Sequence, residues 1–300
     1  MTVDRDLPAR LSALGAAALW GTTGTVQRLG EATHAPGAVG ALRIAFGGVL
    51  LLAIAAVGSQ ELRRVLAILR QHPLAAALAA VGTAAYQVTF FSGVARAGVA
   101  LGTVVALGSA PAITGALGRL FLGERPERGW VPATTLAIAG VALLLLPGRE
   151  VSADAVGVAF VLGAGLSYSV YTLALKRLLD AGGRAVPTVA LLFCIGAVLL
   201  LPFLVAQDLA WLGTGRGLAA AVWLGAGATA VAYLLFAYGL SLLRASTVAT
   251  LTLAEPTTAA VLGTALLVER PGAVGLAGGG LVLAGLVTLV AGRRAVPADI

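Results

Sequence analysis

The chain has 300 residues, of which 59% are hydrophobic and 11% charged, and its formal net charge is +7. A soluble domain usually carries about 25% charged residues, so this composition excludes an ordinary soluble fold and favours an integral membrane protein. The 20 basic residues form no dense run, which argues against nucleic-acid binding. The single cysteine, Cys194, lies in an apolar run, so neither a disulfide framework nor a thiolate metal site is expected.

Ten apolar runs, each near the roughly 20 residues needed to cross the hydrocarbon core, follow one another along the chain. Only helices and closed barrels satisfy every backbone group in lipid, and unbroken apolar runs lack the alternation of a barrel strand. The predicted spans are 11 to 28, 37 to 57, 74 to 93, 98 to 122, 130 to 147, 155 to 175, 187 to 206, 217 to 239, 245 to 268 and 272 to 291. The sequence therefore predicts an all-α integral membrane protein with ten transmembrane helices.

Basic residues fall mainly on one side of this topology. With the N-terminus placed in the cytoplasm, fourteen lie on the cytoplasmic side and five on the outer side, while Arg43 lies inside the second span. Because cytoplasmic loops of membrane proteins are enriched in Lys and Arg, both termini are predicted to be cytoplasmic.

A sequence repeat relates the fourth span to the ninth. The segment from Pro111 to Glu124-Arg125-Pro126 returns 145 positions later, from Pro256 to Glu269-Arg270-Pro271. Since the two spans are five apart, the copies cross the membrane in opposite directions, as in the inverted repeats of many secondary transporters. The predicted five-helix repeats are residues 1–147 and 148–300. The Glu-Arg-Pro loops themselves are expected to tie adjacent helix ends.

These motifs resemble those of a known transporter family. The motifs are Leu19-Trp20-Gly21, Arg43, the Pro111 segment that ends Gly123-Glu124-Arg125-Pro126, and the Glu255-Pro256 segment that ends Glu269-Arg270-Pro271. They look like the EamA domains of the drug/metabolite transporter superfamily, and the resemblance covers essentially the whole chain as two tandem units. It implies a ten-helix carrier with cytoplasmic termini. Within the family, the length and the aromatic-bearing helices resemble the YddG-type exporters of aromatic amino acids and other metabolites.

Polar and aromatic residues are concentrated in six of the ten spans. Spans 1, 3, 4, 6, 8 and 9 carry them and are predicted to wall a central cavity, whereas the nearly bare spans 2, 5, 7 and 10 are expected to lie outside it. Aromatic faces with hydroxyl groups suit an amphipathic organic solute, although helix packing also accounts for individual residues. The cavity candidates are Trp20, Thr23, Tyr86, Gln87, Phe90, Ser109, Tyr168, Tyr171, Tyr233, Phe236, Thr252 and Glu255.

Four further features lie inside the spans. Pro111 and Pro256 each remove a helical hydrogen bond, so they are candidate hinges or static kinks. Glu255 lies near the midplane, where a charged group is a functional candidate. Its alternative roles are proton coupling, a counter-charge for a substrate amine, and stabilisation of the kink at Pro256. Arg43 is expected to anchor helix ends or to pair with a loop carboxylate.

The expected function is export of small organic metabolites, including amino acids with aromatic or apolar side chains, by alternating access in a bacterial inner membrane. Other solute classes stay open: nucleotide sugars, sugar phosphates and drug cations. A phosphate needs convergent Arg or Lys, however, and the deep parts of the spans offer only Arg43. A non-transporting membrane scaffold is a further alternative.

No enzyme activity, catalytic residue, metal ion or cofactor is expected. Glu255 has no carboxylate companion at its depth, and His34 and His72 both fall near loops. The expected partners are the lipid bilayer and a small-molecule substrate, with protons as a candidate coupling ion and no nucleic acid. Either a monomer or a weak homodimer is compatible with the sequence.

Overall fold

The computed structural model describes residues 6–30, 36–147, 154–267 and 272–291, and every regular element in these ranges is a helix. The second Glu-Arg-Pro motif (Glu269-Arg270-Pro271) and His34 lie outside the described residues. Seven helical stretches are long and apolar enough to cross a membrane, and one more apolar helix is shorter. An all-helical, multi-pass membrane protein is therefore confirmed for the described part of the chain.

The helices begin and end close to the predicted spans. They are α1 (Asp6–Gly21), α2 (Thr23–Leu29), α3 (Pro36–Val57), α5 (Pro73–Ala97), α6 (Val99–Phe121), α7 (Trp130–Leu145), α8 (Ala155–Asp180), α9 (Ala185–Leu204), α10 (Gly215–Gly225), the π-helix η2 (Ala226–Val231), α11 (Ala232–Leu242), α12 (Ala245–Leu251), α13 (Ala254–Leu266) and α14 (Ala273–Ala291). Three predicted spans consist of more than one element: α1 with α2, α10 with η2 and α11, and α12 with α13.

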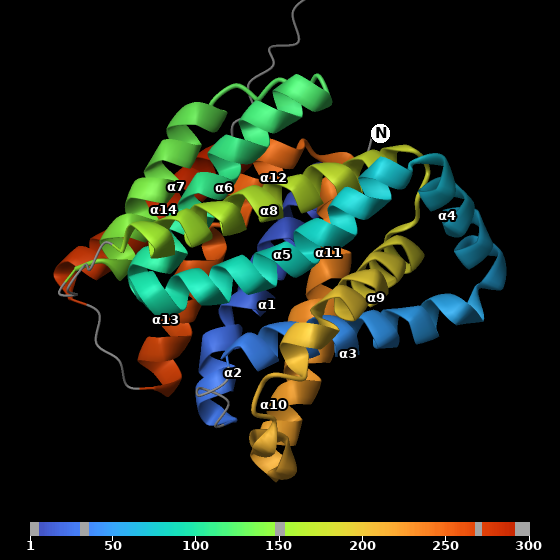
Figure 1. Cartoon of the computed structure of the whole chain (residues 1–300). Helices are drawn as coiled ribbons and strands as arrows, with labels where there is room; N and C mark the ends of the chain where they lie inside the picture. Colours follow the sequence, from blue (N-terminus) through green and yellow to red (C-terminus); the bar gives the residue numbers. More distant parts are fainter. Residues whose placement is uncertain (1–5, 31–35, 148–153, 268–271, 292–300) are drawn as a thin grey trace, which may run out of the picture.

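A helix that the sequence analysis did not predict, α4 (Ser59–Gln71), lies between α3 and α5 at one edge of the molecule (Figure 1). Its apolar residues recur at helical spacing, and Val65, Ile68 and Leu69 are buried. Arg63 and Arg64 on the other face are exposed. The helix was missed because this mixed segment has no apolar run long enough to be a span.

Helices that are distant in sequence pack side by side. The closest associations are α5 with α8, α7 with α14, α3 with α9, α6 with α8, and α1 with α11; α13 also packs on α1. Figure 1 shows α7 and α14 together on one side of the bundle and α3 with α9 on the other. Small residues let these backbones approach, since a Cβ added to Gly140 would lie 2.6 Å from the carbonyl oxygen of Gly278.

The bundle has two ends, which we name after one residue at each. The Glu124 end holds the loop between α6 and α7 together with the start of α1 and the start of α12, which are joined to that loop by hydrogen bonds. The Asp154 end holds the end of α5 and the start of α8, which are joined by an ion pair between Arg96 and Asp154.

Candidate functional site

Two of the predicted spans are interrupted, and the interruptions lie against each other. One falls at Thr22, between α1 and α2, and the other at Thr252 and Leu253, between α12 and α13. At Gly21 an added Cβ would lie 2.7 Å from the carbonyl oxygen of Glu255. The two backbones can therefore approach this closely only because residue 21 has no side chain.

Pro256 explains the interruption in the second of these spans. A proline has no N–H, and its ring clashes with the carbonyl group four residues earlier, which here belongs to Thr252. The amide of Glu255 instead donates to the Thr252 carbonyl at 3.0 Å. Pro111, its repeat mate, lies inside α6, which continues through it.

A central cavity of about 40 Å³ lies beside the interruptions. It is lined by Trp20, Arg43, Gly82, Thr83, Tyr86, Gln87, Leu107, Tyr168, Tyr171, Tyr233, Thr252 and Glu255. All six spans that were predicted to wall a cavity contribute to this lining. The space holds a few water molecules at most, so an organic solute enters only if the helices move apart.

Eight of the twelve predicted cavity residues line this space, and four do not. The eight are Trp20, Tyr86, Gln87, Tyr168, Tyr171, Tyr233, Thr252 and Glu255. Of the others, Phe236 and Phe90 support lining rings, because Phe236 packs 5.5 Å from Trp20 and Phe90 stacks 5.5 Å from Tyr86. Ser109 donates to the carbonyl of Ala106 in its own helix, and the Thr23 hydroxyl is buried without a hydrogen-bond partner in the described structure.

The sequence analysis missed Arg43, Gly82, Thr83 and Leu107 as lining residues. Of the two roles expected for Arg43, pairing with a loop carboxylate is not found in the described part of the chain, where Arg43 instead lines the cavity. Assigning the whole second span to the outside was wrong for the same reason. The sequence did hold an indication of this position, since an arginine within an apolar span avoids lipid by facing protein or a wet cavity.

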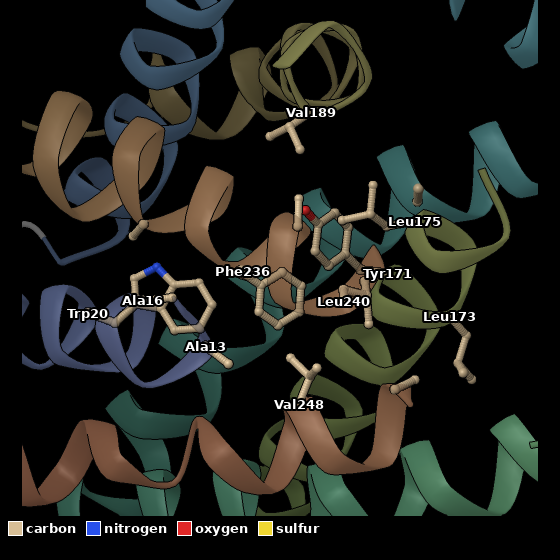
Figure 2. Packing of buried hydrophobic residues seen from close by; sticks show 14 of the residues in the cluster. Ala13, Ala16, Trp20, Tyr171, Leu173, Leu175, Val189, Phe236, Leu240 and Val248 are labelled. Carbon is tan, nitrogen blue, oxygen red and sulfur yellow. The ribbon is translucent and has the colours of Figure 1, made fainter. Parts of the chain in front are cut away.

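Aromatic rings from three helices form one wall of the cavity. Trp20 of α1 meets Tyr233 of α11 edge-on, with ring centroids 4.9 Å apart, and Tyr171 of α8 lies 5.9 Å from Tyr233. Figure 2 shows Phe236 between Trp20 and Tyr171. These separations fall within the range of favourable aromatic pairs, so the wall is a continuous apolar surface that also carries the hydroxyl groups of Tyr171 and Tyr233.

Several polar atoms in the lining have no hydrogen-bond partner in the described structure. They are Trp20 Nε1, Arg43 Nε, Gln87 Oε1 and the Tyr171 hydroxyl, all of them buried. Leaving a buried polar group unpaired costs about 1–3 kcal/mol, and such groups are uncommon in native proteins. The lining therefore has free hydrogen-bonding capacity for a polar ligand.

At the Glu124 end, a buried network of bonds joins the first helix to its neighbours. Arg10 forms an ion pair with Glu127 at 2.7 Å, and the two side chains are 2% and 8% exposed. Arg10 also donates to the carbonyl of Leu289 at 2.6 Å, and Thr247 donates to Glu127 at 3.1 Å. These bonds join α1, α12 and α14 to the loop before α7.

Glu124 extends the network to α8 and α12. Its carboxylate accepts from the Ala245 amide at 2.9 Å and lies 3.7 Å from the Lys176 ammonium group, which donates to the carbonyl of Leu240 at 3.2 Å. Burial raises the pKa of Glu124, although the Ala245 amide and Lys176 act in the opposite direction. The repeated Glu-Arg-Pro motif thus ties helix ends in its first copy. We call Glu124, Lys176 and Ala245, together with Arg10 and Glu127, the latch.

Comparison with known proteins agrees with this architecture. The model of the EamA-like transporter family matches residues 7–146 and again residues 155–291. The chain is 41% identical over 284 residues to "Uncharacterized transporter YwfM" of Bacillus subtilis, covering 95% of this chain and 94% of that protein. It is 32% identical over 249 residues to a "Probable terminal-alkyne amino-acid exporter" of Streptantibioticus cattleyicolor, covering 81% of each.

A solved structure described as "Crystal structure of protein" has a similar fold. Its TM-score is 0.79 at 22% sequence identity, and the match covers 94% of this chain and 96% of that one. The resemblance expected from the motifs is confirmed by the family match over both halves: the chain belongs to the EamA-like transporter family and is a multi-pass membrane transporter.

Proposed function

We propose that the chain exports small organic metabolites, including amino acids with aromatic or apolar side chains, by alternating access to its central cavity. The observation that carries this proposal is the lining, where an aromatic wall from three helices meets one acidic and one basic side chain beside two interrupted helices. The name of the Streptantibioticus relative, an amino-acid exporter, supports the same substrate class.

The proposed architecture is ten transmembrane helices in two inverted repeats, residues 1–147 and 148–300. In this scheme a shift of five spans turns each helix into its mate. The packing supports it, since the pair of spans three and six (α5 with α8) becomes the pair of spans eight and one (α11 with α1). Likewise, the pair of α6 and α8 becomes the pair of α13 and α1. The pair of α3 and α9 maps onto itself, and so does the pair of α7 and α14. The two separate family matches give independent support.

We place the Glu124 end and both termini in the cytoplasm of a bacterium, because this assignment puts most of the basic residues inside. In this orientation the buried latch closes the cavity on the cytoplasmic side. A substrate leaving the cell therefore reaches the cavity only after the latch opens, which makes the latch the inner gate of the transport cycle.

The lining argues against the other solute classes. A sugar phosphate or nucleotide sugar requires several convergent cationic groups, and Arg43 is the one cation in the lining. A drug cation would suit Glu255 and the rings but would be repelled by Arg43. A non-transporting scaffold would not account for the polar atoms of the lining that lack hydrogen-bond partners. Glu255 is also the candidate for proton coupling, which a pH gradient across the membrane would test.

Counterflow in liposomes tests the proposed function. In separate preparations the purified protein is reconstituted with internal phenylalanine, threonine, glucose 6-phosphate or an aromatic quaternary amine, and uptake of the same solute in labelled form is measured. Saturable uptake of phenylalanine without uptake of the phosphate is expected. Absence of saturable flux for every solute would contradict a carrier, and flux of the phosphate or the amine alone would replace the proposed substrate class.

A further inference from the structure

Arg43 and Glu255 are two opposite charges that face one cavity without bonding each other. Both side chains line the cavity. The two form no ion pair within 4.0 Å, and no hydrogen bond between their side chains is present. Each group therefore keeps its own donors or acceptors available.

Neither charge is explained by packing. A charged side chain in the interior of a membrane protein is costly and is usually paired or functional. The Nε atom of Arg43 is buried without a hydrogen-bond partner, although five N–H groups make arginine a strong donor. At the equivalent repeat position, Glu255 is matched by Ala110, which is buried in α6, so the fold does not need a carboxylate there.

We propose that Arg43 and Glu255 bind the two charges of a zwitterionic amino acid, an inference that rests on the proposed function. Arg43 binds the carboxylate of the amino acid and Glu255 binds its ammonium group. Arginine presents a planar fork of donors that matches a carboxylate, and a carboxylate accepts from an ammonium group. A ligand held in this way neutralises both charges of the cavity at once, which a singly charged solute cannot do.

The remaining lining completes the site for such a ligand. The aromatic wall of Trp20, Tyr171 and Tyr233 receives an apolar or aromatic side chain. Trp20 Nε1 and Gln87 Oε1 supply a donor and an acceptor that have no partner in the described structure. Gln87 is 1% exposed, so its side chain has no access to bulk water in this conformer.

The test varies the charge of the ligand and the charge of the protein together. Dissociation constants are measured by ligand-induced thermal stabilisation of the protein in detergent, which does not depend on transport. The ligands are phenylalanine, phenethylamine, which lacks the carboxylate, and 3-phenylpropionate, which lacks the ammonium group. The variants are Arg43→Gln and Glu255→Gln. Coupling between a removed ligand group and a removed side chain identifies the pair in contact.

The wild-type protein is expected to bind phenylalanine at least about 10-fold more tightly than either analogue, as for hydrogen bonds to charged groups. In Glu255→Gln the preference over 3-phenylpropionate disappears while the preference over phenethylamine is retained. Arg43→Gln shows the reverse pattern. Arg184→Gln and Glu61→Gln, which remove the same charges from an exposed ion pair (67% and 39% exposed), are matched controls and leave all three constants unchanged.

Each other outcome overturns the proposal. If a cavity variant weakens all three ligands equally, its role is structural and the zwitterion site is excluded, while export of amino acids stands. If the wild-type protein binds and transports no amino acid, the proposed function and the site both fail. Should the glutamine variants not fold, Arg43→Lys and Glu255→Asp keep the charges but change the geometry, and unchanged binding of phenylalanine in both would exclude direct contact.

Discussion

The two ends of the bundle hold their helices together by different means. At the Glu124 end the ion pair of Arg10 and Glu127 is almost fully buried, whereas at the Asp154 end the pair of Arg96 and Asp154 is 55% and 36% exposed. The same contrast divides the ninth span. Every residue of α12, at the Glu124 end, is buried, but in α13 only Pro256 and Gly263 are. The contacts at the Glu124 end are thus sealed from solvent, whereas those at the Asp154 end are exposed.

The contrast extends to the loop carboxylates. At the Glu124 end, burial raises the pKa of Glu124. At the other end, the hydrogen bond from the Val156 amide lowers the pKa of Asp154, with help from Arg96. Folding therefore disfavours the charged form of Glu124 and favours that of Asp154, because desolvation dominates at the Glu124 end and hydrogen bonding at the Asp154 end.

The largest effect is expected when the latch loses one charge. Glu127→Gln leaves the Arg10 guanidinium buried without its ion-pair partner, and removing one member of a buried pair costs about 3–5 kcal/mol. Thermal unfolding of the purified protein in detergent should show a large fall in the midpoint. A change no greater than that of an exposed pair would mean that the latch does not hold the sealed end.

A smaller effect is expected from one hydrogen bond at the same end. The indole Nε1 of Trp130 donates to the carbonyl of Ser246 at 3.0 Å, joining α7 to α12. Trp130→Phe should lower the free energy of unfolding by about 1 kcal/mol.

Trp211 gives the matched control for that substitution. Its Nε1 is buried without a hydrogen-bond partner in the described structure. Trp211→Phe therefore removes the same atom without removing a bond, and because an unpaired buried donor is itself unfavourable, it should be neutral or stabilising in the same unfolding measurement. Equal effects of the two substitutions would show that ring packing, not the bond to Ser246, accounts for the loss.

The helix positions were largely predictable because nearly every apolar run ends at a glycine, a proline or a charged residue; the run that ends at Ala206 is followed by Gln207. The interruption near Glu255 was foreseeable from Pro256, whose ring would clash with the carbonyl of Thr252 in a regular helix. The interruption at Thr22 was not, since no proline follows it and the close approach of Gly21 to Glu255 is a tertiary contact.

The site was partly predictable for a similar reason. Tyr86, Tyr168 and Tyr233 were found because polar aromatic residues in several spans indicate a shared wall. Arg43 was misassigned because its neighbours along α3 are aliphatic, and composition does not fix which way a helix is rotated. Phe236 was predicted to line the cavity but instead packs against the lining ring of Trp20, since sequence spacing cannot separate a lining ring from the ring that supports it.

The pH dependence of stability should distinguish the two loop carboxylates. Because the folded-state pKa of Glu124 is raised, its contribution is favourable below its ordinary value near 4.5 and is lost as pH rises through the folded pKa. The unfolding midpoint should fall over this interval, and Glu124→Gln should remove the fall. Asp154 has the opposite sign: its contribution is present above about 3.8 and is lost as pH decreases, so Asp154→Asn should act only at acid pH.

The smallest effect is expected at the exposed ion pair. Arg96→Gln removes a pair whose atoms are 3.3 Å apart and largely solvated, and such pairs contribute little to stability. The unfolding midpoint should change little, and added salt should erase the difference because exposed charges are screened. If Arg96→Gln were instead as damaging as Glu127→Gln, the Asp154 end would be held as firmly as the Glu124 end, and the conformer would have to be regarded as closed at both.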